Sequence, residues 1–402
     1  MAESSAQNFP PYSAEIRINS EGGVSLEKHN KIKCLPRSLC EQPPEEPLIW
    51  RFHEHHVTET NLVIREVQTE ETTDSFAPPQ EWLARWRDFE FPLSPLAHWV
   101  LHHWPLEAHL RHWPTVETQN EAVPGFVQIP LLSPTLPPAK HTNAYIVGDE
   151  SFIVVDPATY DDEERSKLKK IIDGRLDAGH KLLAVVLTHH HADHFGAAEW
   201  LRERFHRPII AHPVTQKLLE GRVCIEQTID EDDRIDLGQD RFGRRFELQV
   251  YFTPGHAPGH IVLADLRSNS GAMVVGDMVA AVGTIIVDPD EGDMRDYMSQ
   301  LRRLEQLNPG CLFPAHGPPI PDGPGKLQQY LRHRQAREDM VLSAVKYLNQ
   351  PTLEDIVADA YRDTPKQLHS LAARSCLAHL QKLIKDNKIS ITSNTYNLTP
   401  KN

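Results

Sequence analysis

The sequence predicts an α/β protein with a smaller helical domain at its C-terminal end. Two observations lead to this prediction. From about residue 123, short apolar segments typical of strands alternate with helical stretches, and several of these segments end in His or Asp. From about residue 326 the pattern is helical and closes with a hairpin. We therefore expect residues 1–122 of unknown fold, an α/β region at 123–325 and a winged-helix-like domain at 326–402.

Size and composition indicate a globular protein. The 402 residues, 40% hydrophobic and 24% charged, suffice for two or three domains. The first residues show no secretory pattern, and no segment has the roughly 20 apolar residues of a membrane helix. Five scattered cysteines contain no C-x-x-C pair. We expect a cytoplasmic protein with no membrane partner. The net charge of −14 does not suit binding of nucleic acid over the whole surface.

Local patterns place the elements of the α/β region. Strands are expected at 126–132, 143–147, 152–155, 182–187, 208–211, 248–252, 261–264, 272–275 and 311–313. Helices are expected at 161–176 and 196–205. The first region is rich in Pro, His and Trp, and short helices at 81–89 and 96–111 are expected there.

The sharpest motif is H-x-H-x-D-H, which directly follows the apolar strand at 182–187. His189 and His191 lie on the same side of an extended segment, so both side chains can converge on one point. Asp193 and His194, where the chain turns into the next helix, can face a second point nearby. Four N and O ligands within six residues suit two zinc ions better than one.

Further candidate ligands stand at the ends of other predicted strands. His256 lies in the turn T-P-G-H, Asp277 ends the segment V-V-G-D, and His316 lies in P-A-H-G. A carboxylate such as Asp277 can bridge two ions. Asp156 ends the strand at 152–155 and is a candidate acceptor for a loop N–H or a ligand histidine.

These motifs, in this order, resemble those of the metallo-β-lactamase superfamily. The resemblance implies an αββα sandwich and a division of the ligands. His189, His191 and His256 would hold one zinc ion and Asp193, His194 and His316 the other, with Asp277 between them. The first histidine of T-P-G-H-A-P-G-H is the family ligand, so His260 would be a supporting neighbour, and His190 matches a variable position.

Two ions about 3.5–4 Å apart can share a water and lower its pKa towards about 7. The sequence therefore predicts a zinc hydrolase that uses a metal-bridging hydroxide, with Asp193 and Asp277 as candidate catalytic carboxylates. Iron or manganese is the alternative to zinc. Flavodiiron-type relatives carry Glu at the position of His191, which this chain does not.

Other histidines have plainer interpretations. The segment 53–56 (H-E-H-H) follows no buried strand and is expected to be solvated. His102, His103 and His112 are expected to pack or to face water. For His212, at the end of the strand at 208–211, substrate contact and structural use remain equal alternatives.

The C-terminal region predicts helices at 327–348, 353–361 and 366–384 and a hairpin at 388–397. From residue 326 onward it holds 12 Lys or Arg against 7 Asp or Glu, which favours an anionic ligand. A catalytic region followed by such a domain resembles the beta-lactamase-like protein 2 group, whose members include endoribonucleases acting on single-stranded RNA. The alternatives are a glyoxalase II-type hydrolase of small esters or thioesters, and a nucleic-acid-binding regulator that senses a metabolite. A homodimer is a further candidate state.

Overall fold

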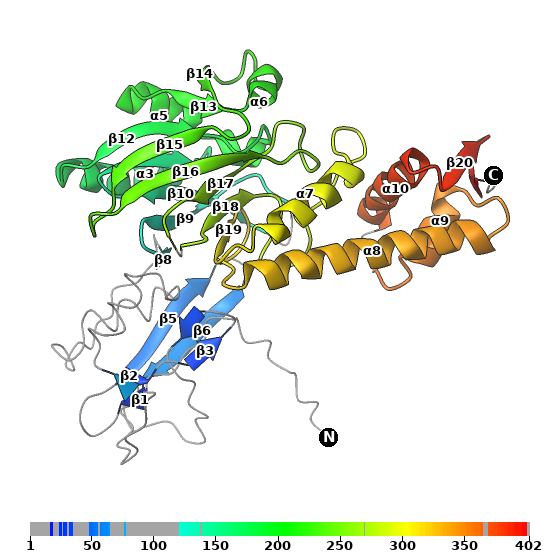
Figure 1. Ribbon diagram of the computed structural model, residues 1–402, viewed down its shortest axis with the longest axis horizontal. Coiled ribbons are helices and arrows are strands. Elements are labelled where there is room, and N and C mark those ends of the chain that lie inside the picture. The colour runs from blue at the N-terminus through cyan, green and yellow to red at the C-terminus, as the bar shows by residue number, and fades with distance from the viewer. Residues whose placement is uncertain are drawn as a thin grey trace.

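The computed structural model describes residues 120–136, 139–268, 270–364 and 369–399, and seven short strands that precede them (Figure 1). The helices predicted at 81–89 and 96–111 lie outside the described residues, as do His102, His103 and His112. Of the segment 53–56, only the backbone of the first two residues is described, in strand β5. The early strands are β1 (Arg17–Ile18), β2 (Val24–Ser25), β3 (Glu27–His29), β4 (Ile32–Cys34), β5 (Leu48–Glu54), β6 (Val57–Ile64) and β7 (Phe76–Ala77).

The first large sheet has seven strands in the order β14-β13-β12-β11-β10-β9-β8. The four strands from β8 to β11 are antiparallel neighbours, whereas β11 to β14 are parallel. Parallel neighbours need crossover connections, which helices supply here. The strands are β8 (Asn120–Val123), β9 (Phe126–Leu132), β10 (His141–Gly148), β11 (Ser151–Val155), β12 (Lys181–Val186), β13 (Ile209–Ala211) and β14 (Ile225–Thr228). The helices are α3 (Asp162–Asp177), α4 (Ala192–Phe195), α5 (Ala198–Phe205) and α6 (Pro213–Leu218).

The second sheet has five strands in chain order, β15 (Arg234–Gln239), β16 (Arg245–Phe252), β17 (Ile261–Asp265), β18 (Met273–Gly276) and β19 (Leu312–Pro314). Its pairs are antiparallel except β18 with β19, which are parallel. The crossover between these two strands contains α7 (Met294–Gln306). Its N-cap is Asp293, whose carboxylate accepts hydrogen bonds from two backbone amides of the first turn.

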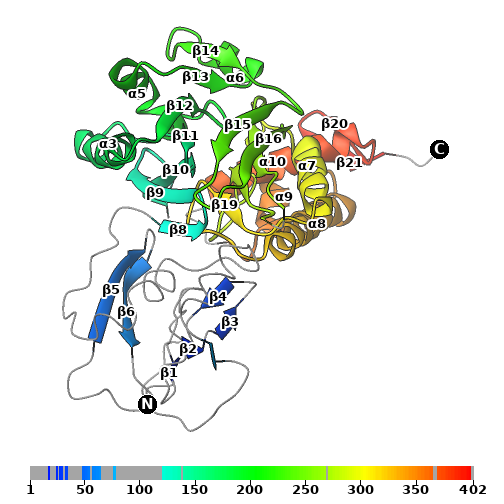
Figure 2. The ribbon, with the colours of Figure 1, turned by 60° about the vertical axis from the view of Figure 1, so that its left-hand side comes forward.

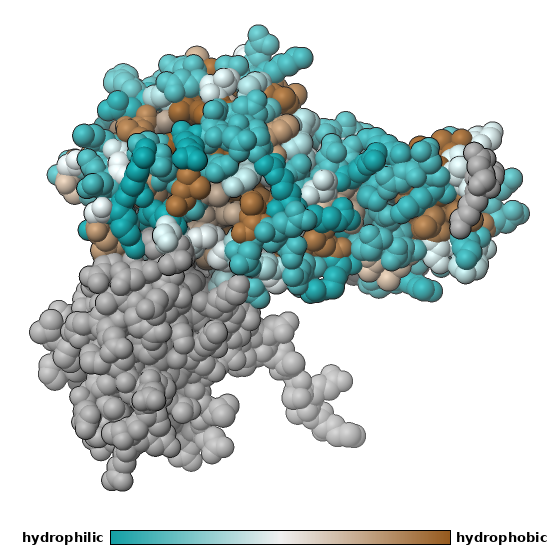
Figure 3. Space-filling model, viewed as in Figure 1, coloured by the Kyte–Doolittle hydropathy of each residue, from teal (hydrophilic) through white to brown (hydrophobic). Residues whose placement is uncertain are grey.

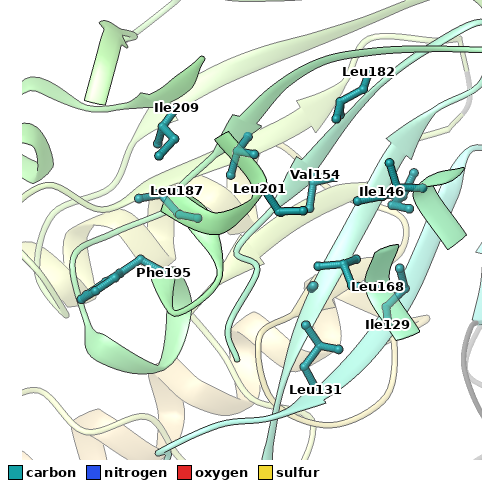
Figure 4. Packing of buried hydrophobic residues seen from close by; sticks show 14 of the residues in the cluster. Ile129, Leu131, Ile146, Val154, Leu168, Leu182, Leu187, Phe195, Leu201 and Ile209 are labelled. Carbon is teal, nitrogen blue, oxygen red and sulfur yellow. The ribbon is translucent and has the colours of Figure 1, made fainter. Parts of the chain in front are cut away.

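The two sheets pack face to face because their strands are apolar on both faces. In β11, Ile153 and Val155 point into the core between the sheets, whereas Val154 points outward beneath α3 and α5. Figure 4 shows this outer cluster, with Leu168 of α3 and Leu201 of α5 close to the sheet. On the far side, α7 covers the second sheet. Helices therefore enclose the two sheets from both sides (Figure 2), and the predicted αββα class is confirmed.

The C-terminal unit consists of α8 (Gly323–Tyr347), α9 (Leu353–Ala360), α10 (His369–Lys385) and the hairpin β20 (Ile389–Thr392) with β21 (Thr395–Leu398). Thr352 and Asp355 form a capping box that starts α9. Helix α8 runs across the expected boundary at 325/326. Its first half, with Leu327 and Tyr330, packs in the α/β core, and its second half, with Val341, packs in the C-terminal core (Figure 1).

Most expected elements appear at the expected places, but the strands β1 to β8, β14 and β15 and the helices α4, α6 and α7 were not expected. Strand β14 is mostly exposed and polar, so it lacks an apolar alternation. Strand β15 does alternate, with Ile235 and Leu237 towards the core between the sheets. Helix α7 also buries residues at helical spacing (Met294, Tyr297, Met298, Leu301 and Leu304), a pattern that the sequence does contain.

The described surface is mainly polar. On the face in Figure 3, hydrophilic residues cover most of the area and apolar residues appear in small groups. None of the described helices combines the length and the apolar character that a membrane crossing requires.

Candidate metal centre

The seven candidate ligands come from loops at one end of the two sheets. His189 and His191 follow β12, Asp193 and His194 lie in α4, and His256 lies between β16 and β17. Asp277 and His316 follow β18 and β19. The side chains form two adjacent groups. Within each group, the possible ligand atoms all lie within 4.8 Å of one another. One group is His189, His191, His256 and Asp277, and the other is Asp193, His194 and His316.

Asp156 organises the loop that carries the first ligands. It follows β11 with φ of +47°, a conformation that Asp tolerates better than most residues. One carboxylate oxygen accepts from the backbone N of Thr188 at 2.7 Å. The other accepts from the Thr188 hydroxyl at 2.6 Å and from His194 Nδ1 at 2.9 Å. Asp156 therefore makes both contacts expected from the sequence, one to a loop N–H and one to a candidate ligand.

Each histidine of the first group has an inner ring nitrogen, which faces the other candidate ligands, and an outer ring nitrogen, which faces away from them. Each outer nitrogen has a hydrogen-bond acceptor, which assigns the ring proton to that nitrogen. The Thr188 hydroxyl donates to Asp156 and can thus accept from His189. The outer acceptors are Thr188 Oγ1 for His189 Nδ1 (3.0 Å), Glu291 Oε1 for His191 Nε2 (2.6 Å) and the Ile286 carbonyl for His256 Nδ1 (2.8 Å).

The inner nitrogens of these rings consequently face one another with unprotonated lone pairs. His191 Nδ1 lies 3.0 Å from both His189 Nε2 and His256 Nε2. Oδ2 of Asp277 lies 3.3 Å from the same nitrogen of His256. Ligands about 2.0–2.1 Å from a tetrahedral ion are about 3.3 Å apart, so the spacing suits a zinc-sized cation. Converging lone pairs repel without a cation, and the donor set therefore fits a metal ion.

The second group has the same design. His194 Nδ1 is bonded to Asp156, and the carbonyl oxygen of His141 lies 3.2 Å from His316 Nδ1, so both Nε2 atoms face inward. The Nε2 atom of His194 is 3.7 Å from Asp277 Oδ2, and that of His316 is 3.4 Å from Asp277 Oδ1. Within the described part of the chain, buried His194 Nε2 and Asp277 Oδ1 have no hydrogen-bond partner. Asp277 thus lies between the two groups.

The charge states of His189 and Asp277 suit metal ligands. Burial, followed by the neighbouring histidines, lowers the pKa of His189 well below its usual value, so the ring is neutral at pH 7. Burial raises the pKa of Asp277, but the imidazoles of His316 and His194 outweigh it and hold this pKa well below its usual range. A neutral imidazole and an ionised carboxylate are the forms that bind metals. Burial lowers the pKa of His194, but the carboxylates of Asp193, Asp156 and Asp277 outweigh it and raise this pKa well above its usual value.

His260 and His190 are not among the seven candidate ligands, although His190, His191 and Glu291 form a third, more exposed group of possible ligands. His260 Nε2 accepts from the backbone N of Asp277 at 3.1 Å and its Nδ1 lies 2.8 Å from the Thr253 hydroxyl, so both ring nitrogens are used. It holds the backbone of a candidate ligand. Gly276 is required beside it, since φ is +47° and a Cβ would lie 2.6 Å from His260 Nε2. His190 points away from the inner nitrogens, towards Glu291 at 3.1 Å.

His212 has structural contacts only, among the described residues. Its Nδ1 caps α6 by accepting from the backbone N of Val214 at 3.1 Å, and its ring stacks on Phe252 at 4.2 Å between centroids. It is not among the residues that line the cavity at the metal centre. Of its two alternatives, the structure supports structural use.

Glu291 was missed by the sequence reasoning. It accepts from both His190 and His191, and these hydrogen bonds lower its pKa far below the ordinary value. It lies 100 residues from His191 in a loop with several acidic residues. Neither strand-end placement nor a motif distinguishes it, so the sequence carries no signal for this role.

A cavity of ≈ 440 Å³ opens over the metal centre. Its floor includes His191, Asp193, His256, Asp277 and His316. Its walls carry mostly apolar or small residues, and no Lys or Arg is among the described residues that line it. The apolar wall residues are Pro134, Leu136, Ala139, Ala192, Ala280, Val282, Ile285 and Ile286. Two carboxylates, Asp288 and Glu291, also line the cavity.

Comparisons with known proteins agree with this architecture. Residues 137–316 match the metallo-beta-lactamase superfamily model, and residues 352–395 match the beta-lactamase associated winged helix domain. A lactamase-like protein nscB of Arthroderma gypseum is 31% identical over 62% of this chain and 78% of its own length. A beta-lactamase-like protein 2 homolog of Drosophila melanogaster is 28% identical over 62% of this chain and 85% of its own. A beta-lactamase domain protein from Burkholderia ambifaria has a TM-score of 0.58 at 22% identity, over 73% of this chain and 96% of its own.

Proposed function

Because the chain belongs to the metallo-beta-lactamase superfamily, we propose that it is a two-zinc hydrolase of small, uncharged esters or thioesters. The observation that carries this proposal is the cavity with candidate ligands on its floor and apolar walls above them. Its volume of ≈ 440 Å³ lies within the ~300–1,000 Å³ range of small-molecule sites.

The proposed ligand division follows the two groups of side chains. His189, His191 and His256 hold one ion, Asp193, His194 and His316 hold the other, and Asp277 is shared. Zinc bound there lowers the pKa of water and polarises a carbonyl group. The supporting observation is that the outer nitrogen of each of the five histidines faces an acceptor, which leaves the inner nitrogens free.

The chain's own residues bind the substrate and handle its protons. The apolar walls exclude water and receive the acyl group. Asp193 lines the cavity, and one of its oxygens accepts from the Thr142 hydroxyl at 3.2 Å. That bond fixes the carboxylate, so its other oxygen can take a proton from attacking water and pass it to the leaving group.

Single-stranded RNA is the second candidate, favoured by the C-terminal winged helix match. Two observations weigh against it. No described cationic side chain lines the cavity, although phosphate contacts supply much of the affinity for nucleic acid. The C-terminal cations also have carboxylate partners, as in the pairs Arg337–Asp363, Lys382–Glu338 and Lys385–Asp293.

The test combines metal analysis with a substrate panel. Purified protein should contain close to two equivalents of zinc by mass spectrometry. It should hydrolyse uncharged p-nitrophenyl esters in preference to S-lactoylglutathione, whose carboxylates meet no described cation in the cavity, and leave a fluorescent single-stranded RNA intact. Cleavage of the RNA alone would replace this proposal by the second candidate. Full metal occupancy without turnover of either class would favour a metabolite-sensing regulator.

A further inference from the structure

The loop between Asp277 and α7 has an inner side that reaches the metal centre. We name residues 280–293 the bridging loop. The Ile286 carbonyl accepts from His256 Nδ1, and Glu291 accepts from His191 Nε2 at 2.6 Å. This one loop therefore supplies hydrogen-bond acceptors to two of the seven candidate ligands. It supplies none of the seven, although Glu291 forms a third group of possible ligands with His190 and His191.

The outer side of the bridging loop is held by α8. The Tyr330 hydroxyl accepts from the backbone N of Ala280 at 2.8 Å and donates to the Gly283 carbonyl at 3.1 Å. The buried guanidinium of Arg334 donates to the Ile285 carbonyl, the residue before the partner of His256. These contacts fix the first half of the loop from the start of the long helix.

The second half of the loop is held by α10. Arg374 Nε donates to Asp288 at 2.6 Å, and its terminal nitrogen donates to both Asp288 and Asp290, the latter at 2.6 Å. Lys385, at the end of α10, pairs with Asp293. Arg374 thus makes a bidentate contact with Asp288 and one further charge-assisted hydrogen bond with Asp290, the residue before Glu291. Part of the cation surplus of the C-terminal region is used in these contacts.

We propose that Arg374 is a positioning residue for the metal centre. The pathway is short: Arg374 holds Asp288 and Asp290, these fix the backbone at Glu291, and Glu291 orients His191. Arg374 does not line the cavity and touches no candidate ligand. The C-terminal domain therefore tunes metal affinity by fixing the loop. This inference rests on the proposed metal site but not on the proposed substrate.

Three full-length variants test this. Arg374→Met removes the contacts, Arg374→Lys keeps the charge but loses the bidentate geometry, and Arg245→Met is the matched control. Arg245 is exposed and also pairs with two carboxylates, Asp236 and Glu247, on β15 and β16 away from the loop. Two readouts need no substrate: hydrogen exchange of peptides covering 280–293 in metal-free protein, and zinc affinity by competition with a chromophoric chelator.

Arg374→Met should speed exchange in the bridging loop and weaken one of two zinc equivalents about tenfold, as loss of support around a ligand does. Arg374→Lys should fall between Met and wild type, and Arg245→Met should match wild type in both readouts. Unchanged exchange and affinity in Arg374→Met would overturn the inference. So would equal weakening in the control. If neither ester nor RNA were hydrolysed, these readouts would still stand, so failure of the proposed function remains distinguishable.

Discussion

Two loops build the metal centre in different ways. Residues 188–194 supply four candidate ligands within a short stretch after β12, and buried Asp156 holds them from the neighbouring strand. The bridging loop supplies none of the seven candidate ligands and instead provides the Ile286 carbonyl and Glu291 as acceptors. Side chains from α8 and α10 hold it in turn. Four of the seven candidate ligands thus come from one local segment of the chain, whereas the acceptors of two candidate ligands lie on a loop that contacts distant helices.

The largest effect should follow from loss of a ligand. Asp193→Ala and His256→Ala should each reduce turnover to background, because an ion that loses one ligand is held less tightly and no longer lowers the pKa of the attacking water. The fold should persist, since Asp193 lies in the one-turn helix α4 and His256 in a loop, and neither belongs to the core between the sheets. Steady-state kinetics with circular dichroism of the same samples checks both statements. Normal turnover in either variant would defeat the assignment of the site.

The next largest effect should come from Asp156→Asn, which should weaken metal affinity about 100-fold. Asn tolerates the positive φ at this position, so the backbone strain is unchanged. It has one acceptor oxygen where three donors converge, from Thr188 and His194, so one donor loses its bond. The metal-free protein should also lose about 1–3 kcal/mol of unfolding free energy. Chelator competition and urea unfolding measure the two effects, and wild-type values in both would contradict the role of Asp156.

The difference between the two loops also explains what the sequence could predict. Strand ends place His189, Asp277 and His316 at one edge, so their proximity follows from alternation and from the order of motifs. The resemblance to the metallo-β-lactamase superfamily is confirmed. Their roles as ligands remain a prediction, although the geometry brings them together. Glu291 and Arg374 could not be predicted, because their contacts depend on how a loop and a distant helix pack.

The charge of the C-terminal region has an explanation within the protein as well, and its prediction of an anionic ligand stays a prediction. Its surplus of Lys and Arg predicted an anionic ligand, but composition cannot show which cations already have partners. Arg374 and Lys385 meet acidic residues of the bridging loop, and Lys382 meets Glu338 within the helical unit. The anionic partners of these cations are thus, at least in part, carboxylates of the same chain.

Glu291→Gln should have a smaller effect than Asp156→Asn, about tenfold in zinc affinity. Glutamine keeps one acceptor oxygen for His191, and Glu291 is half-exposed, so water can replace part of the lost interaction. Glu291 also contacts His190, and we expect the loss of that contact to leave the metal affinity unchanged. His190→Ala is accordingly the control and should leave zinc affinity unchanged. An effect of His190→Ala as large as that of Glu291→Gln would show that Glu291 does not act through His191.

The smallest effect on chemistry, and a clear one on stability, should come from Glu338, which ties α8 to α10. Its buried carboxylate lies 2.7 Å from Lys382 and 3.1 Å from Lys388. Burial raises the pKa of Glu338, but the neighbouring side chains of His379, Lys382 and Lys388 outweigh it and lower this pKa to about 2. Because the folded pKa lies below the unfolded value, the stabilisation is present above about pH 4.5 and lost as the pH falls towards 2.

Glu338→Gln should therefore cost about 2 kcal/mol of unfolding free energy at pH 7 and less at pH 3. Metal-free protein is used for both measurements, so that protonation of the zinc ligands cancels between wild type and variant. If the two helices hold the bridging loop, the same variant should also speed hydrogen exchange at 280–293 at pH 7 while the segment 188–194 keeps its wild-type exchange. If hydrogen exchange became equally faster in both segments, segment 188–194 would also depend on the C-terminal helices, which would contradict the difference between the two loops.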